Sequence, residues 1–141
     1  MNFFDDKINN KLENETAIFC SNDEFSCIYI NSLRKNNILV VTNTLYEANK
    51  IFNSLINYNN NVLFFPTDDF LSEEFFASSP ELEMTRLETI NEIVYSKEKH
   101  IVVTDFMGLI RLLPKKNSWK KNCINIKTGQ IIEKEKLINN L

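Results

Sequence analysis

The chain has 141 residues, of which 43% are hydrophobic and 25% are charged, and its formal net charge is −3. This length fits about one domain with a buried core, and the weak acidic balance argues against a dedicated nucleic-acid binder, which usually carries a basic face. No segment approaches the roughly 20 apolar residues of a membrane span, and the start lacks a signal-peptide pattern, so we expect a cytoplasmic protein with no membrane contact.

Short apolar runs bounded by turn residues alternate with stretches of helical periodicity along the chain. Strands are predicted over Thr16–Cys20, Ile38–Thr42, Val62–Phe65, His100–Thr104 and Cys123–Lys127. Helices are predicted over residues 3–13, 25–33, 45–56, 80–94, 106–113 and 133–141. This alternation predicts an α/β fold, a three-layer parallel sheet with helices on both faces.

Side chains that can accept hydrogen bonds from first-turn N–H groups precede four of the predicted helices. They lie in Ser21–Asp23, in Asn43–Thr44, in Ser78–Ser79 and at Asp105. Pro80 and Glu81 suit the first turn of a helix, and Pro114 ends the helix that Asp105 begins.

The stretch from Val62 to Tyr95 organises the chain. Pro66 stops its strand because proline cannot donate to a sheet ladder, and an acidic, aromatic loop follows over Thr67–Ser79. The helix beyond is expected to face the core with an approximate apolar stripe. The stripe consists of Leu82, Leu87, Ile90 and Val94, with Met84 and Thr85 nearby.

The first predicted strand and helix frame the position where a phosphate-binding loop would lie. Such a loop needs glycines, so that backbone N–H groups can wrap the phosphates, and a lysine that reaches them. The segment from Cys20 to Cys27 has neither, and Asp23 and Glu24 would repel phosphate. We therefore interpret Asn22 or Asp23 as an ordinary helix cap.

Four carboxylates in the acidic loop could bind a metal or act as acid and base. They are Asp68, Asp69, Glu73 and Glu74. No histidine or lysine is near them in sequence, so we interpret them as solvated side chains. Phe70, Phe75 and Phe76 from the same loop either enter the core or cover a neighbouring domain.

The remaining candidates also have structural interpretations. His100 has no partner at a catalytic spacing, and the widely spaced Cys20, Cys27 and Cys123 are the pattern of free thiols in a reducing compartment. These thiols and one histidine are too few for a zinc site. We therefore predict no catalytic residue, no metal site and no cofactor.

A basic loop is predicted at Ser118–Lys121. Its two lysines and two that precede it in sequence could contact phosphate, and its tryptophan, Trp119, could stack on a base or anchor a surface. The lysines are Lys115, Lys116, Lys120 and Lys121. Arg86 and Arg111 could also contact phosphate, although Arg86 shares a helix with acidic residues that suit a local ion pair.

Two groups of residues resemble a known family. Ser79-Pro80-Glu81-Leu82, Arg86-Leu87 and the preceding Pro66-x-Asp68 resemble the N-terminal region of bacterial transcription-repair coupling factor. The segment GLIRLLP at residues 108–114 is similar to the equivalent region of the excision-repair protein UvrB. The resemblance runs from about Thr16 to Leu141, and its first loop follows the degenerate P-loop of the coupling factor, whereas UvrB has a working one.

The resemblance implies a non-catalytic N-terminal scaffold, with a UvrB-like α/β subdomain over residues 1–122 and the start of an inserted subdomain over residues 123–141. The full-length family protein is similar to an ATP-dependent DNA translocase that displaces stalled RNA polymerase and recruits UvrA in nucleotide excision repair. UvrA would meet the inserted subdomain, and RNA polymerase and DNA would meet domains beyond residue 141. The implied direct partners are other domains of the same protein.

Two alternative functions remain beside the scaffold. One is a UvrB-like nucleotide-binding helicase half, which would need the glycines and the lysine that the first loop lacks. The other is a direct DNA-binding domain that uses the lysines of residues 115–121 together with Trp119.

Overall fold

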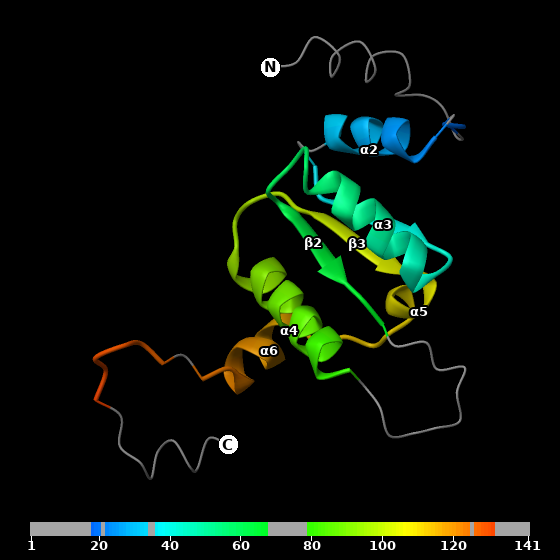
Figure 1. Cartoon of the computed structure of the whole chain (residues 1–141). Helices are drawn as coiled ribbons and strands as arrows, with labels where there is room; N and C mark the ends of the chain where they lie inside the picture. Colours follow the sequence, from blue (N-terminus) through cyan, green and yellow to red (C-terminus); the bar gives the residue numbers. More distant parts are fainter. Residues whose placement is uncertain (1–17, 21, 34–35, 68–78, 125, 132–141) are drawn as a thin grey trace, which may run out of the picture. The chain divides into compact units, whose positions relative to one another are not determined.

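The computed structural model describes residues 18–20, 22–33, 36–67, 79–124 and 126–131 (Figure 1). The chain divides into two compact units, Met1–Arg111 and Leu112–Leu141. The predicted helices over residues 3–13 and 133–141 and most of the acidic loop lie outside the described residues. No helix in the described part of the chain has the length and apolar character that crossing a membrane requires.

The first unit contains a sheet of three parallel strands in the order β1-β3-β2. The strands are β1 (Ile38–Thr42), β2 (Val62–Phe65) and β3 (Ile101–Asp105). Ile101 pairs with both Ile38 and Val62, and Thr42 pairs with Asp105, so the strands share one carboxyl edge. The predicted parallel α/β fold is confirmed, and the last strand begins one residue later than expected.

One face of the sheet carries the hydrophobic core. Alternate strand residues point to this face because side chains in a strand alternate. The fully or largely buried core residues are Cys27, Ala48, Leu55, Val62, Ile101 and Val103. On the opposite face, Leu39 and Val41 of β1 are exposed, at 55% and 40% of their surface, so the described core is concentrated on the first face.

Two capped helices cover this core. α2 (Asp23–Ser32) begins at Asn22, whose side chain accepts from the Phe25 N–H, and α3 (Leu45–Leu55) begins at Thr44, whose hydroxyl accepts from the Glu47 N–H. Both caps were predicted, and each such cap stabilises a helix by about 1 kcal/mol. α3 packs on all three strands, and α2 packs on α3.

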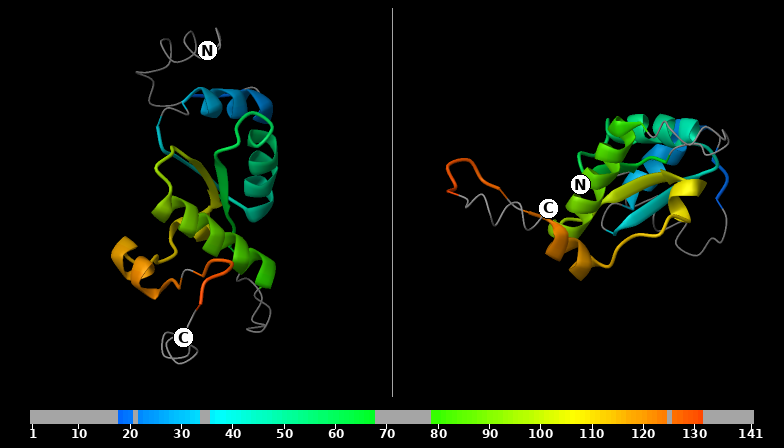
Figure 2. Two further views of the ribbon diagram at one scale, coloured as in Figure 1. Left: turned by 90° about the vertical axis from the view of Figure 1, so that its left-hand side faces the viewer. Right: turned by 90° about the horizontal axis from the view of Figure 1, so that it is seen from below.

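α4 (Pro80–Tyr95) lies beside β2, one of the two edge strands, in both views of Figure 2. The connection from β1 to β2 crosses β3, and the connection from β2 to β3 returns in the opposite direction. Right-handed crossovers in opposite directions place α3 and α4 on opposite sides of the sheet. Pro80 occupies the first turn as predicted, but Ser79 makes no side-chain capping bond.

The predicted apolar stripe of α4 is only partly correct. Val94 is buried, but Leu87 and Met84 are 48% and 62% exposed. The buried positions of the helix include two polar residues instead, Arg86 and Thr89. They face the sheet because their side chains donate hydrogen bonds to backbone carbonyls of the β2 segment, which hydropathy alone does not reveal.

α5 (Phe106–Leu109) follows β3 directly, and the Asp105 side chain accepts from the Gly108 N–H as predicted. The helix ends four residues earlier than expected, so Pro114 does not terminate it. The first predicted strand is also wrong in its described part, because residues 18–20 belong to no strand and Phe19 is 97% exposed. An apolar run makes a strand only where a neighbouring backbone pairs with it.

In the second unit, α6 (Lys116–Asn122) replaces the predicted basic loop. Lysine, asparagine and tryptophan all tolerate a helix, and the Trp119 N–H donates to the Lys115 carbonyl at 2.9 Å. The described residues of the predicted strand Cys123–Lys127 form no strand. Thr128 and Gly129 form a turn, and Gly129 has φ +82°, which suits glycine.

Candidate functional site

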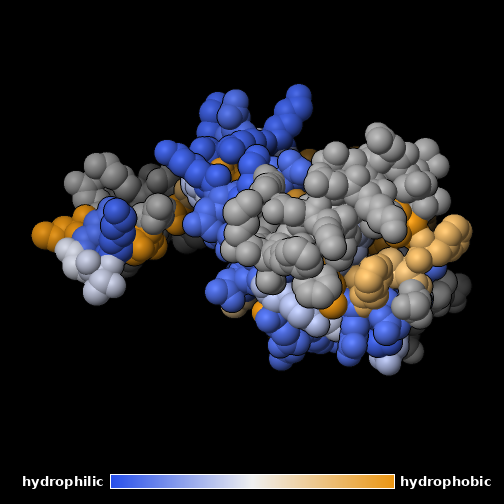
Figure 3. Space-filling model, turned by 90° about the horizontal axis from the view of Figure 1, so that it is seen from above, coloured by the Kyte–Doolittle hydropathy of each residue, from blue (hydrophilic) through white to orange (hydrophobic). Residues whose placement is uncertain are grey.

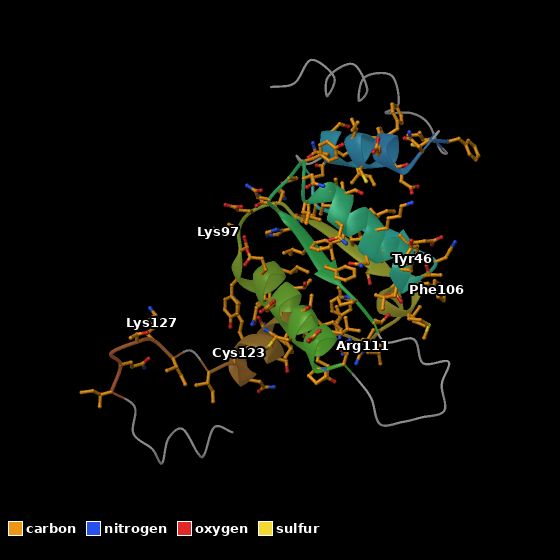
Figure 4. The ribbon with its side chains drawn as sticks, in the orientation of Figure 1. Tyr46, Lys97, Phe106, Arg111, Cys123 and Lys127 are labelled. Carbon is orange, nitrogen blue, oxygen red and sulfur yellow. The ribbon has the colours of Figure 1, made fainter. Side chains whose placement is uncertain are left out.

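The carboxyl edge of the sheet is where an open α/β fold usually binds its ligand. Here the segments after the strands bring together Thr42, Thr67 and Asp105, which end or follow β1, β2 and β3. In Figure 4, Tyr46 of α3 and Phe106 of α5 also lie toward this end of the first unit. Tyr46 is 78% exposed and Phe106 is 53% exposed.

Asp105 and Thr67 form a closed polar contact at this edge. The Thr67 hydroxyl is 2.6 Å from both carboxylate oxygens of Asp105, and the Gly108 N–H donates to Asp105 Oδ1 at 3.2 Å. Thr67 and Asp105 are each 1% exposed. The carboxylate therefore serves as an internal acceptor that joins the end of β2 to the start of α5.

A second contact lies in the same corner of the first unit, where the ends of β2 and β3 meet the start of α5. The Thr104 hydroxyl donates to the Phe65 carbonyl at 2.7 Å. A Cβ atom placed on Gly108 would lie 2.0 Å from Thr104 Oγ1 and 3.3 Å from the Phe65 ring. Gly108 is thus required by the close approach of α5 to the sheet, since real Cβ atoms do not approach other heavy atoms so closely.

Arg86 lies close to this corner and is only 6% exposed. Its guanidinium donates to the Pro66 carbonyl at 3.1 Å and lies 3.9 Å from the Glu83 carboxylate. The predicted local ion pair is therefore present, with Glu83 as its acid. Its burial was not foreseen from the sequence, although Arg86 stands four residues after Leu82, at helical spacing on the same face.

This arrangement favours structural support over chemistry. A general base has to reach a substrate proton, whereas the Asp105 carboxylate is covered and accepts from two internal donors. Within the described ranges, no three His, Cys, Asp or Glu side chains are placed to hold a metal ion. Asp68, Asp69, Glu73 and Glu74 lie outside those ranges, as do Phe70, Phe75 and Phe76.

The first-loop position is occupied by the protein's own capping contacts. The Asn22 side chain accepts from the Phe25 N–H at 2.8 Å, and the Ser26 hydroxyl donates to the Asn22 carbonyl at 3.2 Å. Asp23 forms an exposed ion pair with Lys50 at 2.5 Å. The interpretation of Asn22 as a helix cap is confirmed.

Other candidates are dispersed. His100 is 8% exposed and lies 3.8 Å from Glu92. It directly precedes β3, whereas Asp105 lies at the opposite end of that strand. Cys20, Cys27 and Cys123 are free thiols, and burial next to the Asp23 carboxylate raises the pKa of Cys27.

The basic candidates fall in two places. The exposed lysines of residues 115–121 belong to the second unit together with the half-buried Trp119, whereas the exposed Arg111 ends the first unit. Figure 4 marks Arg111 and, in the second unit, Cys123 and Lys127. Arg86 is held inside the first unit, so it does not join the lysines as a phosphate contact.

Thr67, Thr89 and Gly108 are the important residues that sequence reasoning missed as a group. Their contacts join positions far apart in the chain, for example Thr67 with Asp105 and Thr89 with Phe64. One local signal could have predicted these contacts. Asp105 ends a strand and lies three residues before Gly108, the glycine of a short helix.

Comparison with known proteins finds similarity to the transcription-repair-coupling factors. No protein-family model matches the chain, and no solved structure matches it significantly. Over 106 residues, 74% of the chain, it is 33% identical to the transcription-repair-coupling factor of Bacillus subtilis (strain 168). The corresponding proteins of Staphylococcus epidermidis and Staphylococcus haemolyticus are 31% and 29% identical over the same length.

The matched segment spans only 9% of each of these relatives. The resemblance predicted from the sequence is confirmed as a similarity over 74% of this chain. This chain therefore carries a region related to the transcription-repair-coupling factors.

Proposed function

We propose that the chain acts as a non-catalytic scaffold and interaction module in transcription-repair coupling. Its relatives carry that name, and their region of similarity is one small part of a much longer protein. The observation that carries the proposal is the first loop, in which the Asn22 side chain takes the first-turn N–H donor that a phosphate would need. Asp23 and Glu24 add negative charge at the same helix start.

In this proposal, the α/β unit supports neighbouring domains, and the chemistry of a translocase resides elsewhere in the longer protein. Contact with UvrA would fall to the adjoining subdomain, whose start is the region from about residue 123. Contacts with RNA polymerase and DNA would fall to further domains. The covered Asp105 carboxylate supports this division, because it stabilises the sheet corner and does not face a substrate.

The direct test is a calorimetric titration of the 141-residue chain with ATP and Mg²⁺. We expect no saturable heat, and the same result with ADP. Saturable binding with one site per chain would contradict the scaffold proposal and favour the nucleotide-binding helicase half. A parallel titration of an Asn22→Ala variant should also show no binding, because a helix start freed of its cap still lacks the lysine and the glycines of a phosphate-binding loop.

A second candidate function, direct DNA binding, is favoured by the charge of the second unit. Residues 112–131 contain five lysines and no acidic residue, and four of these lysines lie in or next to α6. Lys116 and Lys120 stand four residues apart on this helix, where like charges repel, so an anionic partner would relieve the repulsion.

DNA binding predicts an affinity for single-stranded oligonucleotides that falls steeply with salt. The variant K116Q/K120Q should weaken binding, whereas K97Q/K99Q removes equal charge from the first unit and should leave it unchanged. Fluorescence anisotropy measures both. Equal losses in the two variants would show that only net charge matters, and the DNA-binding candidate would then be rejected.

A further inference from the structure

A pocket of about 350 Å³ opens beside the edge strand β2. Its lining includes the residues at the amino end of this strand, which is the end opposite the shared carboxyl edge. Its lining combines the edge strand, α4 and one aromatic residue of α3. The members that matter here are Phe52, Val62, Phe64, Glu88, Glu92 and His100. Figure 3 shows mainly hydrophilic side chains on the described surface that faces the viewer, together with several separate groups of hydrophobic ones.

His100 is the first sign that this pocket takes a ligand. Its side chain lines the pocket and is only 8% exposed, yet neither ring nitrogen has a hydrogen-bond partner among the described residues. Glu92 Oε1 is 3.8 Å from Nε2, which is too long for a hydrogen bond. Buried polar atoms without partners are rare. A ligand could supply the missing hydrogen bond, either by donating to a ring nitrogen or by moving the Glu92 carboxylate closer to the ring.

The charge of the lining defines the ligand further. Glu88 and Glu92 stand one helical turn apart on α4, and both are exposed at the rim. Among the residues that the structure describes, no lysine or arginine lines the pocket. Two carboxylates at this spacing repel each other, and a cation between them would remove the repulsion.

An aromatic pair lies on the opposite wall. The rings of Phe52 and Phe64 are stacked, with their centroids 4.9 Å apart and an angle of 16° between their planes. An aromatic face next to carboxylates suits a planar cation, because a guanidinium can stack on the ring and still pair with a carboxylate through its edge.

The backbone of β2 indicates that the cation belongs to a polypeptide. The Ile101 N–H donates to the Asn61 carbonyl, so the alternate residues Val62 and Phe64 direct their backbone groups away from β3, toward the pocket. The Thr89 hydroxyl already occupies the Phe64 carbonyl. An extended segment can therefore add only at the Val62 end, next to Glu92 and His100.

We propose that this pocket binds an arginine side chain of an extended partner segment. The guanidinium pairs with Glu88 and Glu92 over the Phe52–Phe64 pair, and the partner backbone lies along the Val62 end of β2. This inference does not rest on the proposed scaffold function, since a nucleotide-binding chain could present the same pocket.

The test uses blocked tripeptides whose only charge is their central side chain. Acetyl-Val-Arg-Val-amide is titrated into the ¹⁵N-labelled 141-residue chain, and backbone NMR shifts are followed. We expect saturable shifts at Val62–Phe64, Glu92 and His100, and weaker binding of the same peptide with lysine or glutamine at its centre. N-acetyl-arginine amide should also bind more weakly, because it lacks the flanking backbone.

The variant E88Q/E92Q should weaken arginine-peptide binding by about tenfold or more, because hydrogen bonds to charged groups are lost. Glu81→Gln is the matched control, since Glu81 is an exposed acid of α4 outside the pocket, and it should bind as the parent does.

Four results would overturn the proposal. They are the absence of saturable shifts, shifts confined to other residues, equal binding of the arginine and glutamine peptides, and equal losses in E81Q and E88Q/E92Q. Lysine-peptide binding as tight as arginine-peptide binding would remove the assignment to arginine, and equally tight N-acetyl-arginine amide would remove the assignment to a polypeptide. Circular dichroism of each variant confirms that a loss of binding is not a loss of fold.

Discussion

The Thr67 hydroxyl lies 2.6 Å from both carboxylate oxygens of Asp105, although 38 residues separate them in the chain. The contact joins the end of β2 to the end of β3, and both residues are 1% exposed. A buried carboxylate is costly unless it is hydrogen-bonded. Thr67 therefore stabilises the sheet by satisfying Asp105, in addition to the packing of its own methyl group.

Replacing Thr67 with valine should destabilise the fold by about 1–3 kcal/mol, because the carboxylate of Asp105 loses a donor while the volume is preserved. Thr67→Ser is the matched control, since it keeps the hydroxyl and loses one methyl group. Urea denaturation measures both. If T67V were no less stable than T67S, the hydroxyl contact would not be the stabilising element.

Gly108→Ala should destabilise the first unit by about 1–3 kcal/mol or more, because the added Cβ would lie 2.0 Å from Thr104 Oγ1. The loss should be smaller when Thr104 is also replaced by alanine, since the clashing oxygen is then absent. A double-mutant cycle in urea should show a coupling of about 1 kcal/mol or more.

Gly129→Ala is the control for that cycle. Its cost arises from φ +82° alone, because nothing lies within 4 Å of an added Cβ. This cost should be the same with and without Thr104→Ala. A cycle for Gly108 that proved additive would show that α5 moves away from the sheet to accept the methyl group.

Val94→Ala and Leu87→Ala test which face of α4 meets the sheet. The sequence stripe treats the two positions alike, but Val94 is 8% exposed and Leu87 is 48% exposed. We expect about 1–3 kcal/mol of destabilisation for V94A and about 0.5 kcal/mol or less for L87A, measured by thermal or urea unfolding. Equal losses of stability in V94A and L87A would mean that both side chains face the sheet, as the sequence predicts.

Local signals account for what was predictable in this fold. The apolar run Ile38–Thr42 and the caps Asn22 and Thr44 depend on neighbouring residues, and the structure confirms each. The parallel arrangement followed from the alternation of these elements.

Long-range contacts account for what was not predictable. Arg86 and Thr89 face the sheet because they donate to backbone carbonyls about 20 or more residues away, which no periodicity encodes. The apolar run at residues 18–20 lacked a strand to pair with, and the lysines of α6 suited a helix as well as a loop. The pocket beside β2 could not be predicted for the same reason, because residues of α4, β2 and His100 are distant in sequence and line one pocket only after folding.

The pH dependence of stability should reveal the buried thiol of Cys27. Its side chain is fully buried, and burial together with the Asp23 carboxylate raises its pKa above the ordinary value of 9.0. Above pH 9.0 the unfolded thiol loses its proton while the folded thiol keeps it, so the unfolded state binds fewer protons. The contribution of Cys27 to stability is therefore complete below that pH and declines as the pH rises, by at most about 1.4 kcal/mol per pH unit.

Cys27→Ala should remove this part of the alkaline decline, while its smaller side chain lowers stability by a constant amount at every pH. Free energies of unfolding measured in urea between about pH 8 and pH 10 give the slope for each protein. Cys123→Ala controls for the loss of a thiol from the second unit. Because lysines and tyrosines also titrate in this range, the difference between the slopes of the parent and C27A isolates Cys27, and identical slopes would mean that its ionisation is not linked to folding.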